Sequence, residues 1–404
     1  MLRSTHLLVL IVALLATPSA LAETTQTHHH QTRLGIDVLA DANFALLRGK
    51  RVGLVAHAAG VNAELVNSAD VLFDAQEQGG FELVGLYGPE HGVYGDAYAG
   101  DKVEDQRDRR TGIKMYSLYG DTRKPTPEML AEVDVLLVDL QDIGARSYTY
   151  ISTMALAVEA CIEQGKAIVI LDRPNPLGGE RVEGGMVHDQ FRSFVSQLDV
   201  PYLHGMTMGE LALFEAHRVL KEMAKTDDSI RPNAMGVYEY EGLHVVKMEH
   251  WARAMVWEDT GLTWVQTSPH IPTMEAAYAY PTTGILGELY VINIGVGYTI
   301  PFETVADPTV EDAFAFADQL RSHPLMPTGV TVRPMYYKPY YSVHEGELCA
   351  GVQVYIDPHG ASSLSELNFV LIDVLGIANT LAEAPDRHDM FNKVNGSDRE
   401  LKAL

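Results

Sequence analysis

Residues that could carry acid–base chemistry stand at the end of a predicted strand early in the chain. The apolar run 81–87 has the length of a strand and stops in G-P-E-H-G at 88–92, which places Glu90 beside His91. A glutamate there can act as a general acid, and a neighbouring histidine can orient it or a substrate. A Glu-His pair alone belongs to a solvated surface loop about as often as to a functional site. The rest of the chain must decide between these two interpretations.

Two further apolar runs end in the same way. Residues 133–140 and 167–171 form near-continuous apolar stretches, as expected for strands that are buried on both faces. Parallel strands bring their carboxyl ends to one edge of a sheet, where open α/β folds bind ligands. A single aspartate at such a place is more often a turn former or a helix cap, but a group of charged side chains favours a site. The side chains gathered there are Glu90, His91, Asp139, Asp142, Arg146, Asp172, Arg173 and Asn175.

The order of these segments predicts the fold. Strands alternate with helical patterns such as 151–164, which indicates an α/β fold with a Rossmann-like parallel sheet and right-handed crossovers. We expect this domain to span residues 33–236 and a smaller α+β domain, with short strands and turns, to span 237–404. Within the first domain, Thr207 and Glu210 fit a helix capping box. The chain has neither G-x-G-x-x-G after its first strand nor a Walker phosphate loop, so no nucleotide cofactor is expected.

The N-terminus has the pattern of an export signal. Residues 1–22 combine a basic start, an apolar core and an Ala-x-Ala site, which is typical of a secretory signal peptide cleaved after Ala22. We expect a disordered linker at 23–32 and a periplasmic or secreted mature chain that is free of the membrane after cleavage. The formal net charge of −24 argues against nucleic acid as a partner. Cys161 and Cys349 fit no dense disulfide framework, and whether they pair stays open.

Four segments in this order resemble the signatures of the NamZ-type exo-β-N-acetylmuramidases. They are G-P-E-H-G at 88–92, D-L-Q-D-I-G-A-R-S-Y-T-Y at 139–150, L-D-R-P-N-P-L-G-G at 171–179 and H-G-M-T-M-G-E-L at 204–211. The resemblance implies a Rossmann-like domain, a smaller C-terminal domain and an active-site cleft between them. It also implies release of N-acetylmuramic acid from the non-reducing end of peptidoglycan fragments, in cell-wall turnover or recycling, without a cofactor.

Carried over by position, the resemblance points to Glu90 as the principal catalytic carboxylate. Our hypothesis is that Glu90 protonates the glycosidic oxygen, that His91 or a nearby tyrosine supports it, and that Asp142 or Asp139 is the second carboxylate. Arg146 or Arg173 could pair with an anionic substituent of the sugar, whereas the alternative is that Arg146 and Asp142 pair with each other. The expected catalytic residues are Glu90, His91 and Asp142, and the expected substrate-binding residues are Asp139, Arg146, Tyr148, Asp172, Arg173, Asn175 and His270.

One segment departs from the family pattern and keeps other functions open. Many members carry S-E-G-R-G where this chain has N-I-G-V-G at 293–297, so Ile294 and Val296 replace a glutamate and an arginine. The alternatives are a glycosidase for another amino sugar, a muropeptide-binding protein without catalysis, and a metal-dependent hydrolase. The last would use strand-end residues such as His57, although no metal-ligand spacing is present. Retention, inversion and participation of the substrate's acetamido group also stay open.

Overall fold

The computed structural model describes residues 31–97, 106–377 and 385–403, so the expected signal peptide at 1–22 lies outside the described residues. The expected linker at 23–32 is described only from Gln31 onward. Its last residue is packed against the domain, because Thr32 is buried and its N–H donates to the Thr260 carbonyl at 2.9 Å.

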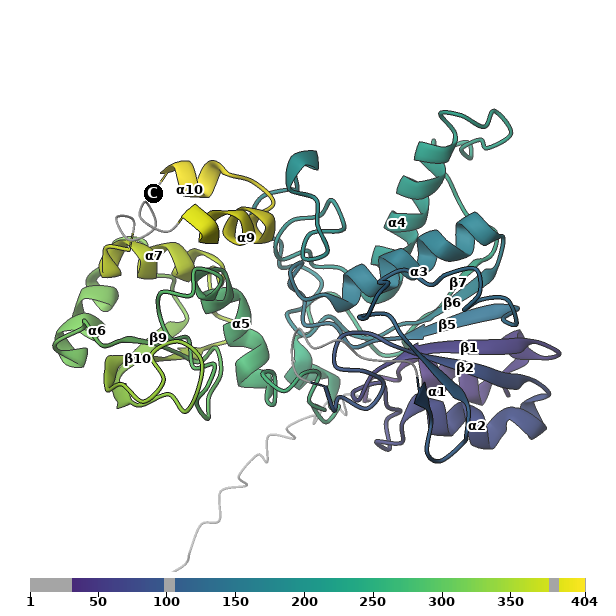
Figure 1. Cartoon of the computed structure of the whole chain (residues 1–404), viewed down its shortest axis with the longest axis horizontal. Coiled ribbons are helices and arrows are strands. Elements are labelled where there is room, and N and C mark those ends of the chain that lie inside the picture. The colour runs from purple at the N-terminus through teal and green to yellow at the C-terminus, as the bar shows by residue number, and fades with distance from the viewer. Residues whose placement is uncertain (1–30, 98–105, 378–384, 404) are drawn as a thin grey trace, which may run out of the picture.

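The first domain contains a seven-stranded, mostly parallel sheet in the order β3-β4-β2-β1-β5-β6-β7 (Figure 1). Only β3 runs antiparallel to its neighbour. Every residue of β5 is buried, as the apolar run at 133–140 predicts. The strands are β1 (Arg51–Ala56), β2 (Glu82–Gly88), β3 (Gln106–Arg107), β4 (Lys114–Ser117), β5 (Val135–Asp139), β6 (Ala167–Leu171) and β7 (Leu243–Val246).

Helices cover both faces of this sheet (Figure 1). One face carries α1 (Gly35–Asp41) and α2 (Ser68–Gly79), and the other carries α3 (Tyr150–Gln164) and α4 (Met208–Met223). The helix ends follow local chemistry: Thr207 and Glu210 form the predicted capping box of α4, and Gly165 ends α3 in the left-handed conformation. Three short 3-10 turns are η1 (Ala45–Leu47), η2 (Asp189–Phe191) and η3 (Trp257–Thr260).

The second domain is smaller and contains an antiparallel sheet in the order β8-β10-β9. Its elements are α5 (Met274–Gly287), β8 (Thr304–Asp307), α6 (Ala313–Ser322), β9 (Val330–Tyr337), β10 (Cys349–Ile356), α7 (Glu366–Leu375), α9 (Pro385–Asn395) and α10 (Arg399–Ala403). The α/β-then-α+β prediction is therefore confirmed. The expected boundary at residue 236 is too early, because β7 pairs in parallel with β6 and completes the first sheet.

Several contacts join the domains. The partly buried carboxylate of Glu183 accepts hydrogen bonds from the Ser363 hydroxyl and from the backbone N–H groups of Leu364 and Ser365, which precede α7. Helix α9 lies beside the segment around η2 (Figure 1), where the His188 N–H donates to the Gly396 carbonyl. Within the described parts of the chain, no helix is long and apolar enough to cross a bilayer.

Candidate active site

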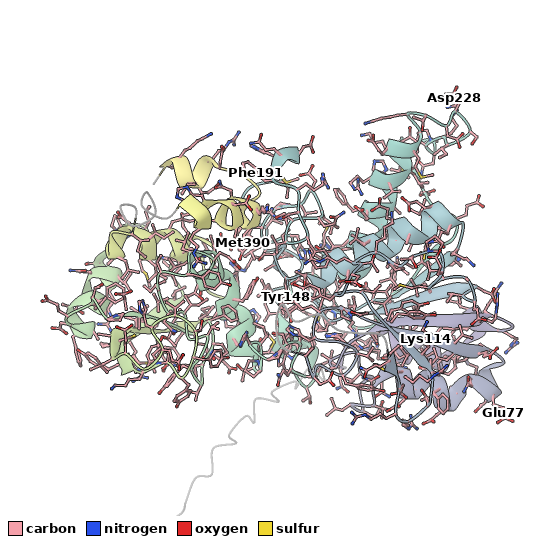
Figure 2. The ribbon with its side chains drawn as sticks, viewed as in Figure 1. Glu77, Lys114, Tyr148, Phe191, Asp228 and Met390 are labelled. Atoms are coloured by element: carbon pink, nitrogen blue, oxygen red, sulfur yellow. The ribbon has the colours of Figure 1, made fainter. Side chains whose placement is uncertain are left out.

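A cavity of about 420 Å³ lies where the two domains meet, and both domains line it. Figure 2 shows two of its lining residues, Tyr148 and Met390, at this junction. The volume falls in the range of small-molecule sites. The lining residues that carry polar or aromatic groups are Glu90, His91, Tyr119, Ser147, Tyr148, Thr149, Ser268, His270, Tyr280, Glu288, Tyr290 and Phe302.

The Glu90 loop enters this cavity directly after β2. The carboxylate of Glu90 accepts a hydrogen bond from the Thr149 hydroxyl at 2.7 Å and another from the Tyr119 hydroxyl. Burial and the neighbouring Glu90 raise the pKa of Tyr119 to about 12, so Tyr119 remains a donor at neutral pH. Hydrogen bonds donated to a carboxylate favour its ionised form.

His91 is held in a defined tautomer beside Glu90. Its backbone adopts the left-handed conformation, with a φ of 69°. Its Nδ1 lies 2.9 Å from the carbonyl oxygen of Ala97, which can only accept, so Nδ1 carries the proton.

Buried tyrosines form the wall between the domains. The Tyr148 hydroxyl donates to the Thr267 hydroxyl at 2.7 Å, and the Tyr148 ring packs edge-to-face against Tyr150 and Tyr280. The Tyr280 hydroxyl lies 3.0 Å from the hydroxyl of Ser147. Burial raises the pKa of each of these tyrosines, so all three are neutral hydrogen-bonding groups.

The sequence interpretation missed a second carboxyl group in the cavity, Glu288. This residue caps the C-terminus of α5 and comes from the opposite domain to Glu90. Its side chain makes no hydrogen bond or ion pair with the described residues, and burial raises its pKa to about 7. A sequence signal did exist: Glu288 is the only charged residue between Glu275 and Glu303.

His270, expected to bind substrate, lines this cavity and also a second one of about 470 Å³ that continues from it. The His270 Nε2 lies 2.8 Å from the Tyr341 hydroxyl. Ile294 and Val296 line the second cavity, so the segment that departs from the family pattern does reach the cleft. Asn293 holds this segment rigid, because its side chain accepts from the Gly295 N–H and donates to the Val296 and Val343 carbonyls.

Asp142, expected to be catalytic, lies outside the cavity lining. One of its oxygens accepts from the Gly144 N–H at 2.8 Å and lies 3.1 Å from His204 Nε2. His204 Nδ1 accepts from the Met206 N–H, so Nε2 is the donor to Asp142. Asp142 therefore joins its own loop to the G-M-T segment that leads into α4.

Four of the expected substrate-binding residues make hydrogen bonds or ion pairs that stabilise the loops after β5 and β6. Arg173 forms a buried ion pair with Asp139, with 2.5 Å between Nε and Oδ1, and its Nη2 also donates to the Val61 carbonyl. Asp172 accepts from the Gly209 N–H and the Thr207 hydroxyl at the start of α4, and burial raises its pKa to about 6. The Asn175 side chain bonds two backbone groups, the Leu177 N–H and the Met206 carbonyl. The capping and turn-forming alternatives account for Asp172 and Asn175, whereas Asp139 and Arg173 pair with each other.

Arg146 is neither a cavity residue nor the ion-pair partner of Asp142. Its guanidinium is fully buried and donates to the carbonyls of Gly185, Val200 and Val394 and to the hydroxyl of Ser196. Val394 belongs to α9, so this cation links the first domain to the C-terminal helix. Its donors are engaged in this way, and Arg146 does not line the cavity.

The strand-end residues do not converge on a metal. His57 Nε2 accepts from the Gln141 N–H at 2.9 Å, and burial lowers the pKa of His57 well below its usual value. Across residues 31–97, 106–377 and 385–403, no three His, Cys, Asp or Glu side chains lie in a group that could hold a metal ion. Cys161 and Cys349 are both buried, free thiols.

Comparison with known proteins places this geometry in a family. The model of the exo-β-N-acetylmuramidase NamZ N-terminal domain matches residues 52–275, and that of the NamZ C-terminal domain matches residues 278–404. The chain is 44% identical, over 86% of its length and 77% of the relative, to the peptidoglycan β-N-acetylmuramidase NamZ of Bacillus subtilis.

Two solved structures share the fold. A DUF1343 family protein from Bacteroides fragilis is 46% identical, with a TM-score of 0.79, covering 92% of this chain and 91% of that one. A second DUF1343 family protein from the same organism is 24% identical, with a TM-score of 0.64, covering 92% and 90%. The matched family regions meet between residues 275 and 278, just inside α5. Together with the identity to the Bacillus subtilis protein, these matches show that the chain belongs to the NamZ exo-β-N-acetylmuramidase family.

Proposed function

We propose that this protein is an exported exo-β-N-acetylmuramidase that releases N-acetylmuramic acid from the non-reducing end of peptidoglycan fragments. The observation that carries the proposal is the position of Glu90, at the wall of a cavity of about 420 Å³ between the domains. The 44% identity to a peptidoglycan β-N-acetylmuramidase, which extends over 347 residues, also supports it. The signal-peptide pattern at 1–22 supports a periplasmic or secreted location, where such fragments arise.

The cavity suits a single sugar unit. Tyrosine and phenylalanine rings supply apolar surface for a pyranose face, and the hydroxyls of Ser147, Tyr280 and Ser268 supply hydrogen-bonding groups. The residues that line the two connected cavities include no lysine or arginine. A lactyl carboxylate must therefore rely on hydroxyl donors or His270, which is why a related uncharged amino sugar is the second candidate substrate.

The test is release of N-acetylmuramic acid from a MurNAc-GlcNAc disaccharide by the purified chain. Chromogenic N-acetylmuramide and N-acetylglucosaminide are measured beside it, with and without chelator. Glu90→Gln should lower kcat/KM by about 100-fold or more, the usual contribution of a positioned acid–base group. The matched control is Glu82→Gln, an exposed carboxylate at the opposite end of the same strand, which should retain full activity.

Each outcome selects one function. Muramide release that is lost in Glu90→Gln and insensitive to chelator supports the proposal. Preferential release from the N-acetylglucosaminide would select the second candidate. Activity that disappears with chelator would indicate a metal-dependent hydrolase, and saturable muropeptide binding without any product would indicate a binding protein.

A further inference from the structure

Glu288 occupies a position in the cleft that the sequence motifs do not explain. It comes from the C-terminal end of α5, whereas Glu90 follows β2, so the two carboxyl groups enter the same cavity from opposite domains. Glu288 also lines the connected apolar cavity beside Ile294 and Val296. Glu90 and Glu288 are the only acidic side chains among the residues that line these two cavities.

The surroundings of the two carboxyl groups differ in kind. Glu90 accepts hydrogen bonds from Thr149 and Tyr119, which stabilise a carboxylate. Glu288 has no such donor among the described residues and shares its cavity with the aromatic rings of Tyr148, Tyr280 and Phe302. Desolvation without a compensating hydrogen bond favours the neutral acid.

Neutral groups dominate the immediate environment of Glu288. The ionisable groups that face it are the hydroxyls of Tyr202, Tyr280 and Tyr290, each of which stays protonated because burial raises its pKa. On the side of α9, the guanidinium of Arg387 lies over the Tyr290 ring at 4.8 Å from its centroid. His270 shares both cavities, and burial lowers its pKa, so it is neutral at pH 7.

We propose that Glu288 is the general acid of the glycosidase and that Glu90 acts as the ionised carboxylate at the anomeric carbon. This assignment rests on the activity proposed above and reverses the role that the sequence suggests for Glu90. Two carboxyl groups whose environments differ in this sense are the usual means by which one site provides both an acid and an anion at neutral pH. The pKa of about 7 for Glu288 agrees with this division.

The chemical step follows from the division of roles. The Glu288 proton moves to the glycosidic oxygen while the bond from that oxygen to C1 breaks, and the bonding pair stays on the leaving oxygen. The leaving sugar departs with a hydroxyl group, and the Glu90 carboxylate faces the positive charge that develops at C1. Water then forms the new bond to C1, and one of its protons restores the Glu288 acid.

Leaving groups of different basicity separate the two roles. A 2,4-dinitrophenolate leaves C1 without protonation, whereas the sugar hydroxyl of MurNAc-GlcNAc requires an acid. Glu288→Gln should therefore lose about 100-fold or more in kcat/KM on MurNAc-GlcNAc but stay close to the wild type on 2,4-dinitrophenyl N-acetylmuramide. Glu90→Gln should lose activity on both substrates. Glu275→Gln, an exposed carboxylate in the first turn of the same helix, is the matched control and should behave as the wild type.

The results that would overturn the assignment are distinct. Glu288→Gln with normal turnover on both substrates, or with equal losses on both, would exclude Glu288 as the acid. A Glu90→Gln variant that keeps activity only on the dinitrophenyl substrate would return that role to Glu90. A wild type that cleaves neither substrate would instead refute the proposed function.

A pH profile provides a second measurement that does not depend on a variant. With MurNAc-GlcNAc, kcat/KM of the wild type should fall as the pH rises above about 7, because the acid form of Glu288 is lost. With the dinitrophenyl substrate this alkaline limb should be weak. A limb of equal size with both substrates would contradict the assignment.

Discussion

Arg146 offers the sharpest test of whether a charged residue in a family motif binds substrate or builds the fold. The proposed change is Arg146→Met, which keeps a long side chain but removes the guanidinium. In the wild type this group donates to the carbonyls of Gly185, Val200 and Val394 at 2.7, 2.6 and 2.9 Å. The variant leaves three buried acceptors without their donor, the carbonyls of Val200 and Val394 and the hydroxyl oxygen of Ser196, whereas the Gly185 carbonyl is only partly buried.

The magnitude follows from two opposing effects. Each orphaned buried acceptor costs about 1–3 kcal/mol, which gives about 3–9 kcal/mol for these three acceptors. Removing a desolvated cation offsets part of this cost. Burial lowers the pKa of Arg146 from 12.5 to about 10, which corresponds to about 3 kcal/mol. The difference is about 0–6 kcal/mol, and we therefore expect Arg146→Met to lower the free energy of unfolding by about 3 kcal/mol, the middle of that range.

Urea unfolding followed by circular dichroism measures this change in unfolding free energy. Steady-state kinetics with MurNAc-GlcNAc tests the alternative that Arg146 binds the sugar carboxylate. Arg51→Met is the control, because Arg51 pairs with Asp134 at the surface and should contribute at most about 1 kcal/mol. If Arg146 binds the sugar carboxylate, Arg146→Met will raise KM while its unfolding free energy stays within about 1 kcal/mol of the wild type. That result would refute the structural role.

Three further predictions concern groups with displaced pKa values. The folded protein holds the Glu288 proton up to a pH of about 7, whereas the unfolded chain releases it near 4.5. The wild type therefore loses stability as the pH rises between these values, and Glu288→Gln should raise the unfolding free energy at pH 8 by as much as about 3 kcal/mol. The hydrogen bonds that Glu183 accepts lower its pKa. The Glu183 carboxylate therefore stabilises the fold at pH values above the pKa of the unfolded chain, and this contribution is lost as the pH falls. Urea unfolding should show that Glu183→Gln costs about 1–3 kcal/mol at pH 7 and less at pH 3.5. Burial raises the pKa of the Cys161 thiol to about 12 and that of the Cys349 thiol to about 11. A thiol reagent at pH 8 should therefore react with neither cysteine until urea unfolds the protein. Rapid labelling of the native protein would contradict this prediction.

The fold could be predicted from sequence because its signals are local. Strand β5 is uncharged except for Asp139 at its end. Asp134, just before the strand, pairs with Arg51. Capping residues such as Thr207 mark helix starts, and the strand–helix order fixes a parallel sheet. The domain boundary was wrong because β7 is only four residues long, and nothing in Leu243–Val246 distinguishes a last parallel strand from a first antiparallel one.

The site was harder to predict because residues at the same sheet edge have different tasks. The carboxyl ends of β2, β5 and β6 do meet, but the direction of each side chain depends on partners that are distant in sequence. Asp139 and Arg173 are 34 residues apart and neutralise each other. Arg146 bonds a carbonyl 248 residues away. Hydrophobic periodicity carries no information on such pairings.

A third of the residues that line the cavity come from the second domain, so the geometry of the reaction depends on how the domains are joined. Glu90 and Glu288 can act on one glycosidic bond only if their relative position is fixed, and a displacement of about 1 Å can lower a rate by about 100-fold. Glu183 and Arg146 supply that fixation without lining the cavity. Changes at these two residues should therefore be judged by kcat as well as by stability. In the proposed mechanism, the Glu90 loop of the first domain and Glu288 of the second therefore depend on inter-domain contacts such as these two.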